Sequence, residues 1–374
     1  MTLRWEIGGP ESRVEAWWQL FDRVTDPPVA SMPAFFLGTV AQSERPSDGP
    51  PRLLRPLGKL FHFFDPRRHG DSTRVLYGFE GERLRAVVPV CVDAQSPFVR
   101  LSWSPEHPTG SWLTDLASPG AVLADALSRF SAVEAVKMPQ RHASDFLAAS
   151  SPAYWRRAEG PRTWTIPVTP LSEFLQCRSR NFRTSVRQAR SLARREGVTV
   201  RRIASLDDFE EALPRLIEVS EASWQGQEAD GTFARAGSLA FYGPLCRGAA
   251  SRGRLDLRLA ESHGRAVGFL LHIRLGRRLE CLKSEQRLDC SHLRTGWIIQ
   301  LSVLETATDE GIDAIGLGLH ETRFKADFGV AEAPTVDVQV FRGAGRALFS
   351  LYVVRERTVR SRSGARNAAL SPWL

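Results

Sequence analysis

The fold is decided by residues 279–318, which read LECLKSEQRLDCSHLRTGWIIQLSVLETATDEGIDAIGLG. Residues 279–286 predict a β-strand, residues 295–310 predict a helix that ends at Gly311, and the apolar residues 312–316 predict the start of another strand. A strand, a helix and a strand in this order form a crossover connection, which is typical of α/β proteins. The sequence therefore predicts a mixed α/β fold.

The residues on either side of this stretch extend the same pattern. Residues 255–261 and 266–273 predict two more strands joined by a short turn, and Ser205 opens a helix with a capping-box pattern. Further strands are expected at residues 74–79, 84–92, 99–103, 132–138, 164–168 and 336–341, and further helices at residues 12–24, 121–130, 238–251 and 322–327 and in the basic C-terminal residues. One more helix is expected to have Thr169 as its N-cap and Pro170 as its first residue.

Two hairpin-like segments resemble each other across the chain. Residues 76–90 and 257–271 both combine a strand, a turn with glycine and an acidic residue, an arginine and an apolar strand. A duplicated α/β unit would explain the similarity and fit the length. Two ordinary hairpins would explain it equally well, so the sequence leaves both interpretations open.

Composition limits the class of protein. A chain of 374 residues has room for about two domains. It has no apolar run of the roughly 18 residues that a membrane-spanning helix needs. Its five cysteines are scattered without a CxxC pair, and its first residues lack the layout of a signal peptide. We therefore expect a cytoplasmic protein with no membrane span and no metal, whose oligomeric state the sequence does not reveal.

The junction between the strand at 279–286 and the helix that follows is a candidate anion site. The first N–H groups of a helix have no intrahelical acceptor and lie at the positive end of the helix dipole. Gly296 lets a phosphate approach the backbone, and Arg294 can add a charge-assisted hydrogen bond. The alternative is an ordinary helix start, because a Thr-Gly pair alone is a weak motif.

A second candidate is a basic helix. Residues 178–202 contain nine arginines and one acid, Glu196. Five of these arginines recur at helical spacing and form one stripe, with an apolar stripe facing it: Arg180, Arg183, Arg187, Arg190 and Arg194. Because no acids are interleaved, the stripe predicts an external anion such as a cofactor phosphate, RNA or an acidic substrate. A solvated helix face in an arginine-rich protein is the alternative.

Candidate reaction-centre residues flank the crossover helix. His320 and Glu321 follow a glycine-rich strand end, where catalytic groups are common in α/β folds, and are candidate general bases. Glu285 shares a strand face with Lys283 and Arg287 by alternation, so a structural ion pair is at least as good an interpretation.

The order of these segments resembles the GNAT acyltransferases of the CelD/BcsL type, which are associated with cellulose biosynthesis. The resemblance is best over residues 170–345 and rests on the basic helix, Leu216–Trp224, Phe241-Tyr242, Gly253–Leu257, Gly264–Gly268, Leu282-Lys283, Thr295-Gly296 and Phe324-Lys325. It implies two GNAT-like units, each a mostly antiparallel mixed sheet flanked by helices: a degenerate unit at 1–165, a complete acyl-CoA-binding unit at 166–345, and a basic helix and tail at 346–374.

The resemblance also implies an activity and a site. An N-acyltransferase of this type moves the acyl group of acetyl-CoA or another acyl-CoA to an amine or hydroxyl of a small molecule or saccharide, without a metal. The implied cofactor-binding residues are Lys283, Arg287, Arg294, Thr295, Gly296 and Trp297. The implied catalytic residues are Glu285, His320, Glu321 and Lys325. The chain has Phe324 where the family usually has tyrosine, so any proton donation by that hydroxyl is lost.

Two other functions stay open. Tandem GNAT-like units also build the Fem-type aminoacyl-tRNA-dependent ligases, in which case the basic helix would hold RNA. The other alternative is a binding module without catalysis that docks anionic partners through residues 178–202 and the basic tail.

Overall fold

The computed structural model describes residues 3–9, 12–24, 32–33, 72–92, 98–101, 112–130, 132–150, 154–227, 231–234, 236–319 and 321–342. The predicted C-terminal helix at 346–374 and His320 lie outside these residues.

Both halves of the described chain contain strands and helices. Its first half contains β1 (Arg4–Gly8), α1 (Val14–Arg23), β2 (Ser72–Glu80), β3 (Arg83–Val92), β4 (Phe98–Leu101), β5 (Leu113–Thr114), α4 (Pro119–Ala126), β6 (Ala132–Pro139), α5 (Gln140–Ser150) and β7 (Tyr154–Pro167). Its second half contains α6 (Leu171–Gln176), α7 (Arg180–Arg195), β8 (Val198–Ile203), α8 (Leu206–Glu221), α9 (Trp224–Gln227), α10 (Ala236–Ala250), β9 (Leu255–Ser262), β10 (Arg265–Leu275), β11 (Arg278–Gln286), a 3₁₀ helix η4 (Leu288–Leu293), α11 (Thr295–Ala307), β12 (Ala314–Leu319), α12 (Arg323–Phe328) and β13 (Val330–Phe341).

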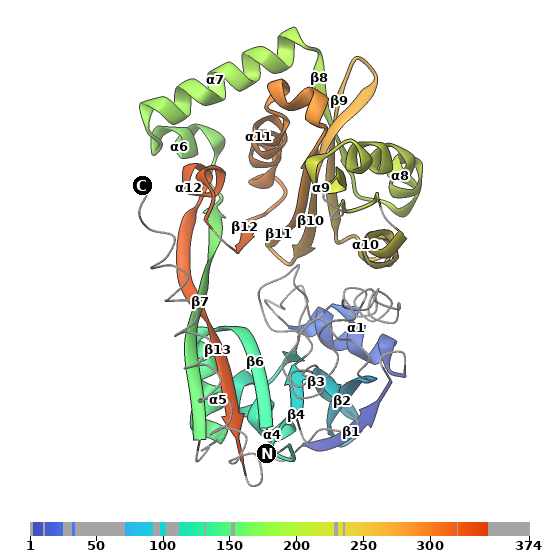
Figure 1. Cartoon of the computed structure of the whole chain (residues 1–374), viewed down its shortest axis with the longest axis vertical. Helices are drawn as coiled ribbons and strands as arrows, with labels where there is room; N and C mark the ends of the chain where they lie inside the picture. The colour runs from blue at the N-terminus through green and yellow to red at the C-terminus, as the bar shows by residue number, and fades with distance from the viewer. Residues whose placement is uncertain are drawn as a thin grey trace, which may run out of the picture.

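The described strands belong to one sheet that passes through both halves. Its order is β1-β2-β3-β4-β6-β13-β7-β12-β11-β10-β9-β8, with β5 paired to β3. The predicted mixed α/β fold is confirmed, but the two units share a sheet instead of each having its own. The long strands β7 and β13 form the ribbon that joins the lower and upper parts of the molecule in Figure 1.

Both halves repeat one plan. In the first, β2, β3 and β4 form an antiparallel meander, and α4 crosses over to β6, which pairs parallel to β4. In the second, β9, β10 and β11 form the meander, and α11 crosses over to β12, which pairs parallel to β11. The two hairpins that resemble each other in sequence occupy equivalent places, which favours a duplicated unit.

The final strands of the two halves are exchanged. β7 ends the first half but pairs with β12 of the second through residues 163–167. β13 ends the second half but pairs with β6 of the first through residues 335–341. The division at residue 165 therefore stays a prediction, since each side of it supplies a strand to the other's part of the sheet.

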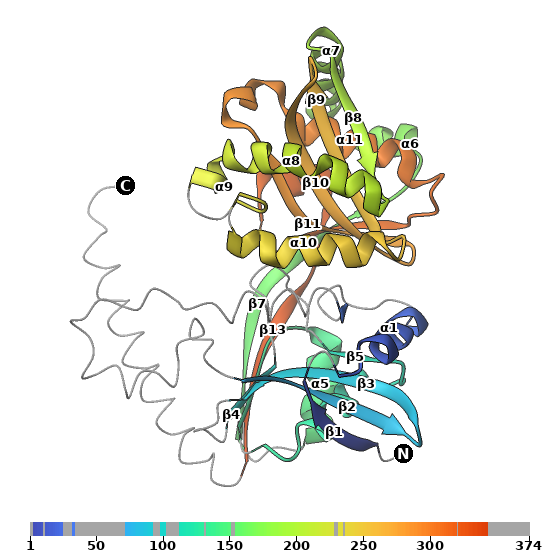
Figure 2. The ribbon, with the colours of Figure 1, turned by 90° about the vertical axis from the view of Figure 1, so that its right-hand side faces the viewer.

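Helices cover both faces of the sheet in the second half. α8 and α10 bury Phe209, Leu216 and Leu245 against one face (Figure 2), and α7 and α11 bury Val186 and Leu301 against the other. The first of these cores also includes Trp17 and Phe21 of α1, so α1 packs against the second half.

The helix starts were predicted with mixed success. Ser205 caps α8 as predicted, because its hydroxyl accepts a hydrogen bond from the Asp208 N–H at 3.1 Å. The predicted cap at Thr169 is wrong by one residue, since α6 starts at Leu171 with Pro170 in the cap position and no side-chain cap.

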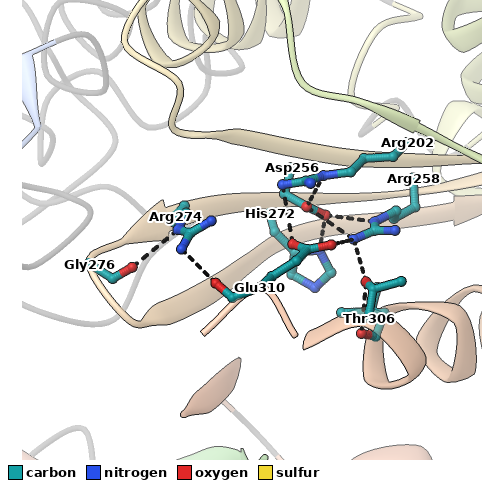
Figure 3. Close-up of polar contacts among 9 residues, drawn as sticks. Arg202, Asp256, Arg258, His272, Arg274, Gly276, Thr306 and Glu310 are labelled. Atoms are coloured by element: carbon teal, nitrogen blue, oxygen red, sulfur yellow. Dashed lines mark hydrogen bonds and ion pairs between the residues drawn. The ribbon is translucent and has the colours of Figure 1, made fainter. Parts of the chain in front are cut away.

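A buried charged cluster holds the C-terminal end of α11 (Figure 3). Asp256, which is fully buried, pairs with Arg202 at 2.7 Å and with Arg258 at 2.8 Å. Arg258 also bonds Thr306 of α11, and the guanidinium of Arg274 donates to the Glu310 carbonyl at 2.8 Å. Cations at this end complement the helix dipole. The cluster fixes α11 from behind and leaves its N-terminal end free for another role.

Candidate functional site

The sheet opens between two parallel strands of the second half. β11 and β12 pair at three rungs only, which join residues 278–280 to residues 314–316. β11 continues to Gln286 beside β10, while β12 continues to Leu319 beside β7. We call this gap, between residues 281–286 and 317–319, the strand opening. It leaves backbone groups on its two edges without a strand partner across the gap.

A β-bulge lies at the start of the strand opening. Lys283 pairs with Leu271 and Cys281 pairs with His272, so Leu282 has no opposite residue. An extra residue of this kind bends its strand and increases the local twist. The bulge therefore helps to turn β11 away from β12 at the point where the pairing stops.

The N-terminal end of α11 lies at the end of β11. Arg294 precedes the helix in the left-handed region, with φ of 55°, and no side chain caps the helix. The N–H groups of Trp297 and Ile298 bond back to the Arg294 carbonyl. Among the described residues, the N–H groups of Thr295 and Gly296 have no acceptor. A Cβ built on Gly296 would meet no atom within 4 Å, so space for a ligand exists there.

Arginine and aromatic side chains surround this helix start. The Arg294 guanidinium lies over the Trp297 ring, 5.2 Å from its centroid, and donates to Gln188 of α7 at 3.4 Å. The Trp297 ring in turn contacts Phe324 and Phe328 of α12. The predicted residues Arg294, Thr295, Gly296 and Trp297 thus lie at an uncapped helix start, and cofactor binding by them stays a prediction.

The predicted site residues of β11 lie on the opposite face. Lys283 and Glu285 pair with Leu271 and Phe269, whose side chains belong to the core under α8 and α10. Because opposite residues of an antiparallel pair share a face, Lys283 and Glu285 point away from α11. Cofactor binding by Lys283 therefore stays a prediction that the geometry does not favour.

Glu285 is a buried anchor of the chain that joins α8 to α10. Its carboxylate is 2% exposed and accepts hydrogen bonds from the Thr232 N–H at 2.7 Å, the Thr232 hydroxyl, and the Ser223 hydroxyl at 3.3 Å. The expected ion pair on this strand face is replaced by these neutral donors. Both oxygens are occupied, so the predicted catalytic role of Glu285 stays a prediction and its contacts favour a structural role.

Arg287 bonds within its own turn. Its guanidinium pairs with Asp289 at 3.1 Å and donates to the Glu218 carbonyl at 3.3 Å. Hydrogen bonds from Arg287, and then from Arg265, hold the pKa of Asp289 at about 2. The charge of Arg287 is thus already balanced by Asp289, and cofactor binding by Arg287 stays a prediction.

Lys325 lies on the other side of the strand opening. Its ammonium donates to the Leu319 carbonyl at the end of β12, and burial lowers its pKa. Burial raises the pKa of the Cys281 thiol of β11, and the charge of Lys325 acts against this rise. Glu321 is exposed, and the cap of α12 is supplied instead by Thr322, whose hydroxyl accepts from the Lys325 N–H at 3.2 Å. Catalytic roles for Lys325, Glu321 and His320 stay predictions.

Sequence reasoning missed a polar cluster at the last paired rung before the opening. Glu280 of β11 pairs with Gly316 of β12, and its carboxylate bonds Arg278. Arg278 also donates to Thr165 at 3.0 Å, and Thr165 donates to Glu332 of β13 at 2.6 Å. Burial alone would raise the pKa of Glu332, but hydrogen bonds from Thr163 and Thr165 and the charge of Arg278 lower it. The available signal was the glycine of β12 opposite a carboxylate, which is visible only once the register is known.

The arginine stripe lies on α7, which crosses the top of the molecule in Figure 1. No acid is interleaved in the stripe itself, but one comes from another helix, because Arg190 pairs with Glu305 of α11 at 2.6 Å. Arg187 bonds the Thr184 hydroxyl, and Arg183 bonds the Arg178 carbonyl. Arg180 and Arg194 are exposed and have no carboxylate partner among the described residues. Anion binding by the stripe stays a prediction, with Arg190 the least available member.

Comparisons with known proteins agree with this fold. Residues 180–326 match a family model described as an acetyltransferase (GNAT) domain. The solved structure of FemX is 13% identical, covers 85% of this chain and 98% of its own, and has a TM-score of 0.53. The C-terminal domain of a putative lysylphosphatidylglycerol synthetase from Agrobacterium fabrum is 13% identical, covers 77% and 90%, and has a TM-score of 0.51. L-PGS from Bacillus licheniformis is 12% identical, covers 76% and 88%, and has a TM-score of 0.51.

These likenesses establish the fold and not the substrates. None of the curated proteins matches the chain. The matching family model is the broad GNAT one, so the finer resemblance to the CelD/BcsL type stays a prediction. In the described parts of the chain, no helix is long and apolar enough to cross a bilayer, and no three or more His, Cys, Asp or Glu side chains gather as metal ligands would.

Proposed function

We propose that this protein is an acyl-CoA-dependent acyltransferase, which moves the acyl group of a CoA thioester to an amine or hydroxyl of a small molecule or saccharide. The observation that carries the proposal is the uncapped start of α11 beside the strand opening. Free N–H groups at Thr295 and Gly296, open space over Gly296 and the adjacent Arg294 suit a diphosphate.

The residues around the opening support a direct transfer. Backbone N–H groups at the bulge in β11 can bond the oxygen of a thioester carbonyl, which gains negative charge during attack. The ammonium of Lys325 lies across the opening and adds positive charge there. Two fixed binding sites would also place acceptor and donor in contact, which makes their reaction effectively unimolecular.

Glu280 is the described carboxylate best placed to receive the proton of the acceptor. It lies on the rung where the two strands separate and on the face away from α11. Its ion pair with Arg278 stabilises the charged form and weakens it as a base, so Glu280 would accept the proton only after a neutral amine has attacked, when the nitrogen has become positively charged. Phe324 has no hydroxyl, so the thiolate would leave without a proton from that position.

A direct experiment measures binding and turnover together. Isothermal titration should show CoA binding to the purified protein, and a thiol-reactive dye should report CoA release from acetyl-CoA when amines are supplied. Absence of CoA binding, with intact folding, would contradict the proposal.

A second candidate is transfer from an aminoacyl-tRNA. The exposed arginines of α7 favour it, because α7 runs beside the start of α11, where its Gln188 accepts a hydrogen bond from Arg294. Stabilisation by aminoacylated tRNA and not by acyl-CoA would support this candidate. Salt-sensitive binding of any polyanion without acyl transfer would support a non-catalytic module.

A further inference from the structure

Arg278 is shared between two carboxylates at the edge of the strand opening. Its guanidinium bonds Glu280 of the same strand, and its Nη1 lies 3.7 Å from Oε1 of Glu332 of β13. Its Nη2 donates to the Thr165 hydroxyl at 3.0 Å, and that hydroxyl donates to Glu332 at 2.6 Å. One carboxylate would balance the arginine, so the second gives these three charged side chains one negative charge in excess.

The register of the sheet brings these side chains together. Glu280 of β11 lies opposite Gly316 of β12, which in turn lies opposite Thr165 of β7. Because Gly316 has no side chain, the carboxylate of Glu280 lies over β12, and Arg278 reaches across this strand to Thr165. Glu280 is therefore linked to a charge on β13 across two intervening strands, at the place where β11 and β12 separate.

An irregularity in β13 holds Glu332 toward this cluster. β13 has two residues, Glu332 and Ala333, where β7 has only Thr163. Thr163 donates to Oε2 of Glu332 at 2.6 Å, and Thr165 donates to Oε1. Bulges of this kind redirect side chains and are common beside active sites, and a partly buried charge is costly unless hydrogen bonds compensate it. The bulge and the two threonines therefore keep a charged carboxylate beside an arginine that already has one.

We infer that Glu332 is a positioning residue that increases the affinity of Glu280 for the acceptor's proton, because it takes part of the hydrogen bonding of Arg278. An arginine that served Glu280 alone would hold it in the charged form and make it a weaker base. Arg278 instead divides its N–H groups, and the negative charge of Glu332 further disfavours the charged form of Glu280. This inference rests on the proposed function and states how the proton acceptor of that site is adjusted.

Other charged groups act at the start of the opening. Lys283 of β11 and Lys325 of α12 affect, together with Glu280, the thiol of Cys281. The residues that β12 and β7 add to the cluster are uncharged. Because both lysines stay the same in every variant below, differences between the variants report the acidic and hydroxyl partners of Arg278.

The test is the pH dependence of kcat, measured with saturating acetyl-CoA and an acceptor that gives turnover in the dye assay. The acid limb of this profile reports the base of the bound complex, so Glu280→Gln should lose the limb. Glu332→Gln removes the second charge and keeps the shape, and it should move the limb to lower pH by roughly 0.5–1 pH unit. Thr165→Val breaks the link to Arg278 and should move the limb in the same direction.

The matched control is Thr163→Val, which removes an equivalent hydrogen bond to Glu332 from a residue that does not bond Arg278. It should leave the limb in place. Glu210→Gln, which removes a negative charge from an exposed pair with Arg247, should also leave it in place.

Three results would count against the inference. An unmoved limb in both Glu332→Gln and Thr165→Val would overturn it and leave the proposed function standing. An equal displacement in Thr163→Val would overturn it too, because the effect would then not pass through Arg278. A wild type that transfers no acyl group to any amine or hydroxyl acceptor supplied would overturn the inference together with the proposed function.

Discussion

The carboxylate of Glu280 occupies the space that any side chain at Gly316 would need. A Cβ built on Gly316 would lie 2.0 Å from Oε2 of Glu280, across the last rung that joins β11 to β12. The glycine therefore permits a charged group to lie over the neighbouring strand at the rung where the sheet divides.

Replacement of Gly316 by alanine should displace Glu280. The new methyl group cannot share the position of the carboxylate, so Glu280 must rotate away and weaken its contact with Arg278. We expect a loss of about 1–3 kcal/mol in the free energy of unfolding, measured by urea titration, and a lower rate of acyl transfer. Gly296→Ala is the matched control, since a Cβ there meets open space. Equal stability of both variants would contradict the assigned contact.

Gly296→Glu should abolish CoA binding and keep the fold. The position accepts a side chain without a clash, but a carboxylate there would occupy the phosphate space and repel the diphosphate. The melting temperature should stay near that of the wild type, while titration calorimetry should show no CoA binding. Gly296→Ala adds bulk without charge and should retain measurable affinity. Unchanged affinity of the glutamate variant would place the anion elsewhere.

Glu285 should prove to be a stabilising residue. Thr232→Val removes one donor from its buried carboxylate and keeps the side-chain volume, so the free energy of unfolding should fall by about 1–3 kcal/mol. Glu285→Gln should likewise lower stability and leave kcat close to that of the wild type. A large loss of kcat in a stable Glu285→Gln variant would instead support the catalytic role predicted from sequence.

Stability should fall as the pH decreases from about 6.5 to about 4, in part because of His272. Burial, together with the nearby Arg258, lowers the pKa of His272 to about 4 against the pull of Asp256. Between pH 6.5 and pH 4 the unfolded chain is protonated at this histidine and the native state is not. Protonation therefore favours unfolding, and the free energy of unfolding decreases by about 3 kcal/mol as the pH falls through this window. Arg202, Glu310 and Thr306 complete its charged and polar surroundings.

The control for this prediction is another histidine. His272→Leu should flatten the stability profile between these pH values, measured by urea titration at several pH values. His292→Gln, at an exposed position, should keep the profile of the wild type. A profile that His272→Leu does not alter would contradict the role of this ring.

The arginines of α7 should contribute unequally to anion binding. Arg187→Glu with Arg194→Glu should weaken CoA binding at low ionic strength, by on the order of 1 kcal/mol per charge, because no carboxylate neutralises these side chains. Arg190→Glu should have a smaller effect on CoA and a larger one on stability, since it sets two carboxylates against each other at Glu305. The difference in affinity should shrink in high salt. Equal CoA affinity of all variants would support the alternative that the arginines of α7 form a solvated helix face.

Local patterns predicted the elements well. The helix at 295–310, the strand at 279–286 and the Ser205 cap follow from short-range periodicity and capping chemistry, and the structure has all three. Topology was less accessible, because the exchange of β7 and β13 depends on pairings between residues more than a hundred positions apart. No period or turn in the sequence encodes such a partner choice.

The candidate site divides in the same way. The start of α11 was predictable because a helix end creates its own chemistry from consecutive residues. The contacts of Glu285 and Glu280 were not, since alternation gives the face of a strand but not the neighbours across it. The charge of the basic helix was evident from sequence, whereas the acid that meets Arg190 comes from a helix more than a hundred residues away.

The exchanged strands also affect how this molecule unfolds and aggregates. Separation of the two halves would remove β7 from β12 and β13 from β6. The exposed edges of β12 and β6 would then present unpaired N–H and C=O groups, which can pair with strands of other molecules and cause aggregation. Neither half of the present chain, separated from the other, would keep its complete set of strand partners. Loss of one half should melt the other in a single cooperative transition.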